Sequence, residues 1–233
     1  MKRNAWKLTV LLGILMICAA GGLCVYNVRE SKEAAAFSGQ VVQSLKQSIP
    51  TPAEKDPQKP ESGQPQEEDL FAPYETAEPV QNEPAQDIRI GNDAYCGYLE
   101  LPTLGLELPV MSSWSYPALK RAPCRFSGSA PDNDLIIAAH NYSAHFGRIG
   151  DLLTGDRIIF TDTAGQTYNY NVAFTEVIEG TDVEQMFSGQ ATDWDLTLFT
   201  CTLSGQSRVT IRAYRQTDEP ASDAEPEDGE EAA

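Results

Sequence analysis

Between residues 88 and 214 the sequence is a series of short apolar stretches separated by turn residues, and this pattern restricts the possible folds more than any other feature. The separating residues are rich in Gly, Pro, Asp and Asn, which favour turns over continued strands. The predicted strands are residues 97–101, 106–110, 133–139, 156–161, 168–177, 196–200 and 208–214, and residues 146–153 have helical spacing. Short strands at this density, with few short helices, predict a mostly antiparallel β-barrel or β-sandwich.

The N-terminal region carries a second strong pattern. Residues 8–26 contain no charged side chain and follow Lys2, Arg3 and Lys7. A helix of about 20 residues, rising 1.5 Å per residue, crosses the roughly 30 Å hydrocarbon core of a bilayer. Positive charge before the apolar run predicts a cytoplasmic N-terminus and a remainder outside the cell membrane. A cleaved signal peptide is the alternative, but the run is long for one. We therefore interpret residues 1–28 as a cytoplasmic N-terminus and a single-pass signal anchor.

The negative charge of the chain is concentrated outside the predicted domain. The net charge is −17, and of 34 Asp and Glu residues ten lie in residues 50–87 and eight in 218–233. Residues 50–87 also contain eight prolines, which predicts a disordered linker that holds the domain off the membrane. We expect residues 217–233 to be a disordered acidic tail and residues 29–49 a possible stalk helix. The domain, residues 88–216, shows no basic face, which argues against nucleic acid as a partner.

The chain has five cysteines: Cys18, Cys24, Cys96, Cys124 and Cys201. The first two lie in the apolar N-terminal run. Cys96 and Cys124 are interpreted as small buried apolar residues, although one disulfide with one free thiol stays open. Cys201 differs because it ends an apolar strand directly before the turn signal Ser204-Gly205. A thiol in that place is a candidate nucleophile, with a buried core cysteine as the alternative.

A cysteine nucleophile needs a proton acceptor or a cationic neighbour, because the thiolate is the attacking species. The chain has two histidines. His140 closes the strand at 133–139, at a sheet edge where a pocket can open, whereas His145 lies in the next connection and is expected to be exposed. A structural role is the alternative for His140. Arg208 begins the strand after the thiol, and Arg212, four residues on, points to the same face and stays an alternative cation.

In combination these residues resemble the sortases, which are membrane-anchored cysteine transpeptidases of Gram-positive cell surfaces. Residues Thr197-Leu198-Phe199-Thr200-Cys201 fit the family's T-L-x-T-C motif at every fixed position. The other matching positions, in chain order, are Leu135-Ile136-Ile137-Ala138-Ala139-His140-Asn141, Phe146-Gly147, Gly155-Asp156 and Arg208. The resemblance covers residues 97–214, which is nearly the whole predicted domain.

The resemblance implies an eight-stranded sortase β-barrel with a few short helices. It implies that Cys201 attacks a sorting motif similar to L-P-x-T-G and forms a thioester acyl-enzyme. His140 would protonate the leaving amine and later accept a proton from an incoming amine of a cell-wall precursor or a pilin lysine. Arg208 would bind substrate and stabilise developing negative charge, and Thr200 would add a substrate contact. Surface proteins with a C-terminal sorting signal are the implied partners.

Two other functions stay open at this point. An exported cysteine peptidase would only hydrolyse, because water also resolves an acyl-enzyme. A non-catalytic cell-wall interaction module on the same barrel is the second alternative. Glu107, Asp182 and Glu184 are candidate calcium ligands, but we interpret them as solvated surface carboxylates, and we predict no metal and no cofactor.

The resemblance also bears on the class of sortase. The connection between residues 173 and 194 has at most one helical turn, at 182–186, which leaves little room for the long extra helix of class B enzymes. No second apolar span follows the domain in this sequence, unlike in many class C members. A class A, D or E enzyme is therefore expected.

Overall fold

The computed structural model describes residues 5–50, 85–187 and 194–216. Helix α1 spans Ala5–Ser48 and helix α2 spans Tyr116–Leu119. The strands are β1 (Ile88–Ile90), β2 (Asp93–Leu101), β3 (Leu106–Met111), β4 (Cys124–Ser127), β5 (Leu135–Ala138), β6 (Arg157–Asp162), β7 (Thr167–Glu179), β8 (Leu196–Cys201) and β9 (Ser207–Arg215). Three 3₁₀ turns are η2 (Pro102–Leu104), η3 (Ile149–Asp151) and η4 (Glu184–Met186).

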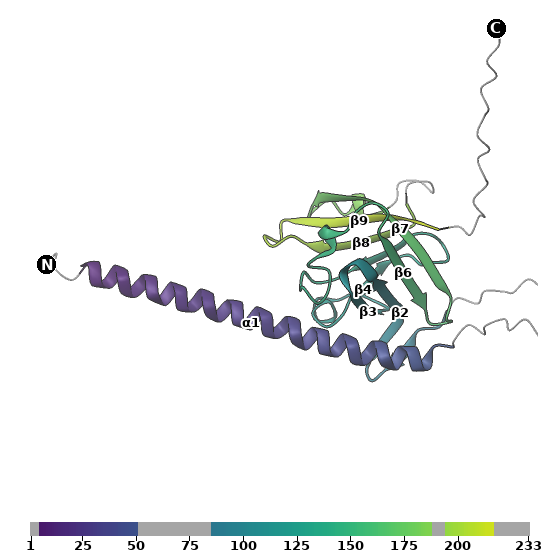
Figure 1. The fold of residues 1–233 in the computed structure, drawn as a ribbon, viewed down its shortest axis with the longest axis horizontal. Coiled ribbons are helices and arrows are strands. Elements are labelled where there is room, and N and C mark those ends of the chain that lie inside the picture. The colour runs from purple at the N-terminus through teal and green to yellow at the C-terminus, as the bar shows by residue number, and fades with distance from the viewer. Residues whose placement is uncertain (1–4, 51–84, 188–193, 217–233) are drawn as a thin grey trace, which may run out of the picture.

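The strands form one closed sheet. Their order is β1-β2-β3-β4-β5-β8-β9-β7-β6, and β6 pairs back with β2. The eight strands β2 to β9 therefore close into a barrel, while β1 adds a short antiparallel strand beside the start of β2. The β3–β4 and β5–β8 pairs are parallel and the other pairs are antiparallel. The predicted eight-stranded barrel, with few helices, is confirmed (Figure 1).

Closure between β2 and β6 requires a glycine. Gly97 has a φ of +154° and pairs with Asp162. A Cβ at this position would lie 2.2 Å from the carbonyl oxygen of Thr161. The β2–β3 register also shifts between Tyr95 and Gly97, as at a β-bulge. A side chain here would push β2 away from β6 and open the barrel.

The interior of the barrel is filled by inward-facing side chains, which alternate with outward-facing ones along each strand. Members of this core include Leu99, Leu101, Val110, Leu135, Ile137, Ile158, Phe160, Tyr170, Val172, Leu196, Leu198, Ile211 and Ala213. Because Leu196 and Leu198 face inward, the alternation on β8 turns Phe199 and Cys201 toward the outer surface. The core therefore fixes the direction in which the candidate nucleophile points.

Residues 146–153 do not form the predicted α-helix. Only the 3₁₀ turn η3 (Ile149–Asp151) is present there. The buried side chains of this segment are Phe146, Ile149 and Leu152, which are spaced by three residues. That spacing fits a 3₁₀ turn, which has three residues per turn, and not a longer α-helix. Strands β1 and β4 and helix α2 were not predicted from the sequence, because each has only three or four residues.

Helix α1 is continuous from the apolar run into the predicted stalk. It is the one helix in the described part of the chain that is long and apolar enough to cross a membrane. Its first half leaves the barrel, while its second half lies along it (Figure 1). Val41, Leu45 and Ile49 of the second half are buried in a cluster with Tyr95 and Met111 of the barrel.

This docking bears on the role expected of the linker. Because the second half of α1 itself contacts the barrel, the linker is not the sole link between the helix and the domain among the described residues. That residues 50–87 hold the domain off the membrane stays a prediction. Most of that linker, residues 51–84, lies outside the described residues, as does the predicted tail at 217–233. Their predicted disorder stays a prediction.

Candidate active site

The β8–β9 hairpin brings the candidate nucleophile and a cation together. Cys201 is the last residue of β8 and pairs directly with Arg208 of β9. Directly opposed residues of an antiparallel pair project from the same face of the sheet. The hairpin turn is closed by a hydrogen bond of 2.9 Å from the amide of Thr202 to the carbonyl of Ser207, and Gly205 supplies a positive φ of +73°. The thiol is exposed, so a substrate can reach it.

His140 approaches the same place from the neighbouring strand. Strand β5 runs parallel to β8, with Ala138 paired to Phe199. The amide of Ala139 donates to the carbonyl of Phe199 at 3.1 Å, and the hydroxyl of Thr200 donates to the carbonyl of Ala139 at 2.9 Å. Extending this register by two residues places His140 beside Cys201. The three predicted catalytic residues therefore lie at adjoining ends of β5, β8 and β9.

The Thr200 side chain does not face this surface. It is buried, and its hydroxyl bonds to the backbone just before His140. In this structure Thr200 ties the nucleophile segment to the histidine segment, and the substrate contact expected of it stays a prediction.

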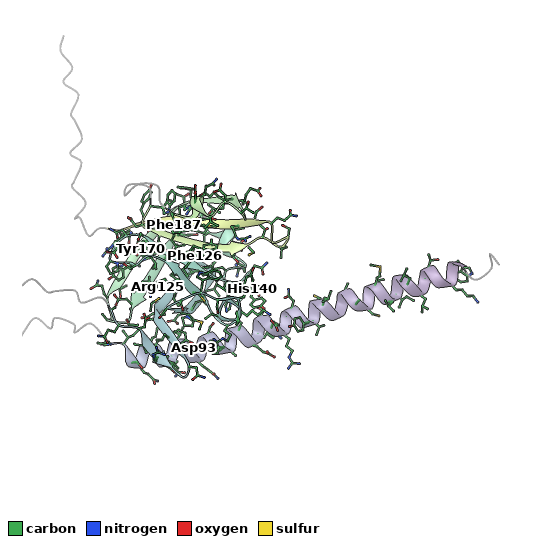
Figure 2. All side chains as sticks on the ribbon, turned by 180° about the vertical axis from the view of Figure 1, so that it is seen from behind. Asp93, Arg125, Phe126, His140, Tyr170 and Phe187 are labelled. Atoms are coloured by element: carbon green, nitrogen blue, oxygen red, sulfur yellow. The ribbon has the colours of Figure 1, made fainter. Side chains whose placement is uncertain are left out.

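The imidazole of His140 is half-buried and stacks on a tyrosine. Its ring lies 4.1 Å from that of Tyr142, with an angle of 16° between the ring planes. Burial lowers the pKa of His140, while a hydrogen bond with Asn141 and the charge of Glu30 act in the opposite direction. Figure 2 shows His140 on the side of the barrel next to α1. Neither Tyr142 nor Glu30 was singled out in the sequence.

His145 was expected to be exposed, and this prediction is wrong. Its side chain is fully buried. The chain folds back after His140 because the amides of His145 and Gly147 both donate to the carbonyl of Tyr142 at 2.9 Å. That turn tucks the side chain beneath the loop. Burial and the charge of His140 lower the pKa of His145 to about 4, so it is neutral at pH 7.

The structure separates the two candidate arginines. The hydrogen bonds of Arg208 use Nη1, which donates to the carbonyls of Gly205 (3.0 Å) and Ser207 (3.1 Å) in the hairpin turn. Arg212 pairs with Thr197, four residues before Cys201, which is about 13 Å along the strand. Arg208 is therefore the arginine beside the thiol.

Arg212 is fully buried and is held by several groups. Its guanidinium donates to Glu176 at 2.8 Å and to the hydroxyl of Thr197 at 2.9 Å, and it lies 4.1 Å from the ring centre of Trp194. It also donates to the carbonyls of Gln185 and Met186. Burial lowers the pKa of Arg212, and the ion pair with Glu176 opposes that effect. These contacts connect β9 to β7, β8 and η4, which is a structural role.

A family model described as the sortase domain matches residues 99–216 of the chain. The chain belongs to the sortase family. The match begins within β2 and ends just after β9, so it includes the three strand ends described above.

This sortase is also similar to solved structures of other sortases, at low sequence identity. Sortase C from Clostridium perfringens SM101 is 23% identical, with 56% of this chain and 73% of that chain covered and a TM-score of 0.46. Sortase C1 from Streptococcus agalactiae is 22% identical, with 56% and 72% covered and a TM-score of 0.49. The Clostridium perfringens sortase D5 transpeptidase is 20% identical, with 53% and 79% covered and a TM-score of 0.47. A search of curated proteins gave no match.

An aromatic surface adjoins the thiol of this sortase. Phe199 projects from the same face of β8 as Cys201. Its ring packs against that of Phe126 on β4 at 5.3 Å, and Phe126 contacts Trp114 at 5.8 Å and Phe187 at 6.2 Å. Trp114 and Phe187 are more than 40% exposed. That Phe199 and Cys201 share a strand face could be predicted from their spacing in the motif. The other three rings could not be predicted to join them, because they come from distant segments of the chain.

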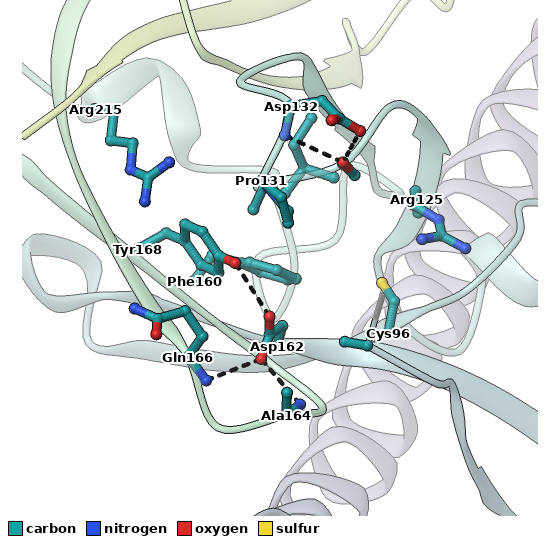
Figure 3. Close-up of a pocket in the computed structure, with 14 residues that line it drawn as sticks. Cys96, Arg125, Pro131, Asp132, Phe160, Asp162, Ala164, Gln166, Tyr168 and Arg215 are labelled. Carbon is teal, nitrogen blue, oxygen red and sulfur yellow. Dashed lines mark hydrogen bonds between the residues drawn. The ribbon is translucent and has the colours of Figure 1, made fainter. Parts of the chain in front are cut away.

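A cavity of about 530 Å³ lies at the other end of the barrel (Figure 3). It is lined by Leu135, the first residue of β5, and Arg215, the last residue of β9, whereas His140 and Arg208 lie at the opposite ends of these strands. The carboxylate of Asp162 in this cavity accepts hydrogen bonds from Ala164, Gln166 and Tyr168. These contacts close the β6–β7 turn, and the cavity is separate from the candidate active site.

The other residues singled out from the sequence are Cys96, Cys124 and the surface acids. Cys96 and Cys124 are buried free thiols, which confirms their interpretation as small core residues. Burial raises the pKa of each thiol to about 12. Among the predicted surface acids, Glu107 forms an ion pair with Lys46 of α1.

Proposed function

We propose that this sortase is a membrane-anchored cysteine transpeptidase that cleaves a sorting motif similar to L-P-x-T-G and transfers the acyl part to an amine. The observation that supports it best is the pairing of Cys201 with Arg208 on one hairpin, next to the strand that ends in His140. An exposed thiol, an imidazole and a guanidinium at adjoining strand ends are the groups that thioester chemistry needs.

In the first step the Sγ of Cys201, as a thiolate, attacks the carbonyl carbon of the peptide bond that joins the last two residues of the motif. The C–N bond breaks, and His140 gives its proton to the leaving amine. In the second step the nitrogen of an incoming amine attacks the thioester and the C–S bond breaks. His140 accepts the proton from that nitrogen, and the thiolate is restored. The imidazole therefore acts once as acid and once as base.

Arg208 is proposed to bind the substrate backbone and to stabilise negative charge on the carbonyl oxygen. A guanidinium has five N–H donors, and within the part of the chain that the structure describes the two hydrogen bonds of Arg208 both use Nη1. A charged donor aimed at a developing oxyanion stabilises the transition state more than the ground state. Its position directly opposite Cys201 supports this role.

The aromatic surface formed by Trp114, Phe126, Phe187 and Phe199 is proposed to receive the apolar side chains of the motif. It continues from the thiol along β8 and across to β4. Burying apolar substrate groups against such rings supplies binding free energy of roughly 25 cal/mol per Å². A sortase C of Clostridium perfringens has been solved with the C-terminal cell wall sorting motif, and the proposed substrate is of the same kind.

We propose that the apolar half of α1 spans the cell membrane with the N-terminus in the cytoplasm and the barrel outside. The acceptor is proposed to be an amine of a cell-wall precursor or of a pilin, and the class to be A, D or E. Positive residues before the apolar run support this orientation.

The test is an incubation of the full chain with a sorting-motif peptide, with and without an added amine. We expect a new product that contains the amine, at a yield that rises with amine concentration, and no product from Cys201→Ala. Cleavage at the same rate without any amine-containing product would show a peptidase that only hydrolyses. Absence of cleavage and transfer with peptides of several sorting motifs would favour the non-catalytic module.

A further inference from the structure

We propose that the anchor helix is part of the active site: Glu30 of α1 holds Tyr142, and Tyr142 positions the imidazole of His140 and supports its protonated form. Tyr142 is thus a positioning residue, and Glu30 acts through it and through its own charge. The proposal rests on the proposed function of His140 as proton donor and acceptor.

The contacts form an unbroken chain from the helix to the imidazole. The hydroxyl of Tyr142 donates to Oε2 of Glu30 at 2.7 Å, across 112 positions in the sequence. The hydroxyl of Tyr26 donates to Oε1 of the same carboxylate at 2.7 Å. The buried Tyr142 ring then stacks face to face on His140. Both carboxylate oxygens are therefore engaged, which fixes the carboxylate and, through it, the ring beneath the imidazole.

A second contact joins the same two segments. The hydroxyls of Ser31 and Ser143 lie 3.2 Å apart, next to the Glu30–Tyr142 pair. Glu30 lies four residues, or about 6 Å along the helix axis, beyond Tyr26 at the end of the apolar run. The helix therefore reaches the histidine loop immediately after it leaves the proposed membrane segment.

The protonation states suit this arrangement. Hydrogen bonds from Tyr26 and Tyr142 lower the pKa of Glu30, so that it is a carboxylate at neutral pH. Burial and the hydrogen bond to Glu30 raise the pKa of Tyr142 to about 12, so that its hydroxyl remains a donor. A negative carboxylate near His140 favours the imidazolium, as does the face of an aromatic ring.

Other groups that face His140 act on it as well. Lys120, at the end of α2, disfavours the imidazolium, as does burial, while Asn141 favours it by a hydrogen bond. The neutral His145 lies in the same loop, with its ring 5.7 Å from that of Tyr142. Cys201 lies at the neighbouring strand end. Glu30 is the carboxylate among the groups that raise the pKa of His140, so its removal lowers that pKa further.

The direction of the effect on catalysis follows from the mechanism. The first step needs a thiolate and an imidazolium at the same time, so kcat/KM is bell-shaped in pH, with two macroscopic pKa values that belong to the pair. Because burial lowers the pKa of His140, the acid limb lies below the usual value of about 6.5. A further decrease moves that limb to lower pH and reduces the fraction of enzyme in the active form. One pKa unit corresponds to about a tenfold lower maximum.

The experiment uses the full chain in phospholipid nanodiscs, with selectively ¹³C-labelled histidine. The chain has only two histidines, so NMR titration reports His140 directly once its signal is assigned with His140→Ala. Glu30→Gln removes the charge and keeps an acceptor for Tyr142. Tyr142→Phe keeps the ring and the charge but removes the link, and Tyr142→Leu removes the aromatic face. Ser31→Ala is the matched control, because it removes a neighbouring helix–loop contact that does not touch Tyr142.

We expect Glu30→Gln and Tyr142→Phe to lower the pKa of His140 and to shift the acid limb of kcat/KM with it, with a roughly two- to fivefold lower maximum. Tyr142→Leu should have the larger effect, about tenfold, and Ser31→Ala should match the wild type. An unchanged His140 titration in Glu30→Gln and Tyr142→Phe would overturn the proposal, even if their melting temperatures fall. If the wild type proves inactive as a transpeptidase, the proposed function fails, yet the titration still decides this inference.

Discussion

At the level of single residues, Arg208 and Arg212 show how two identical side chains on one strand face can have different surroundings. Arg208 opposes the exposed thiol, and its hydrogen bonds to described residues go to the turn carbonyls of Gly205 and Ser207. Arg212 is fully buried and bonds to Glu176, Thr197 and two backbone carbonyls. We expect removal of the Arg208 charge to lower catalytic activity. Removal of the Arg212 charge should instead lower the stability of the fold.

Arg208→Ala is expected to lower kcat/KM by on the order of 10²–10³-fold, as for the loss of an oxyanion donor, with a melting temperature close to that of the wild type. Arg212→Ala should instead lower the free energy of unfolding by on the order of 3 kcal/mol, because it leaves buried partners unpaired. Peptide-transfer kinetics and thermal unfolding of both variants provide the measurement. The assignment fails if Arg208→Ala keeps full activity, or if Arg212→Ala loses activity without losing stability.

Much of the candidate site could be predicted at this scale, because Cys201, His140 and Arg208 each belong to a local motif at the end of a strand. His145 could not, since its burial results from two backbone hydrogen bonds to the carbonyl of Tyr142. The Tyr142–Glu30 contact could not either, because it joins positions 112 residues apart. Local sequence patterns carry no information on such pairs.

At the level of elements, α1 combines two environments within one helix. Its first half exposes apolar side chains such as Leu15 and Ile17, as a membrane segment would. Its second half buries Leu45 against the barrel, and Lys46 pairs with Glu107 of β3. The i, i+4, i+8 spacing of Val41, Leu45 and Ile49 predicts a helix from the sequence. It does not predict the surface against which that helix packs.

Leu45→Ala tests this docking. Truncating a buried leucine costs about 2–5 kcal/mol, so the second half of α1 should exchange its amide hydrogens faster and detach more easily from the barrel. Gln47→Ala is the matched control, because Gln47 is exposed on the same turn. Hydrogen–deuterium exchange of the full chain measures both. Equal protection of α1 in Leu45→Ala, Gln47→Ala and the wild type would contradict the docked helix.

At the level of the whole molecule, the barrel presents its two ends differently. One end carries Cys201, His140 and Arg208 and contacts helix α1 through Tyr142, while the other end holds the closed turn around Asp162. The barrel itself was expected from the strand density and the family resemblance. The placement of α1 was not, because the linker between α1 and β1 suggested a free tether. The proposed active site therefore lies close to the proposed membrane surface.

The central claim is that Cys201 forms a thioester with a sorting-motif peptide, and intact-protein mass spectrometry tests it most directly. The full chain is incubated with the peptide without added amine and is then acid-quenched. We predict an adduct whose mass equals the peptide part before the cleaved bond, located on Cys201, absent from Cys201→Ala, and discharged when an amine is added. Peptide transfer without such an adduct, or full activity in Cys201→Ala, would contradict the account.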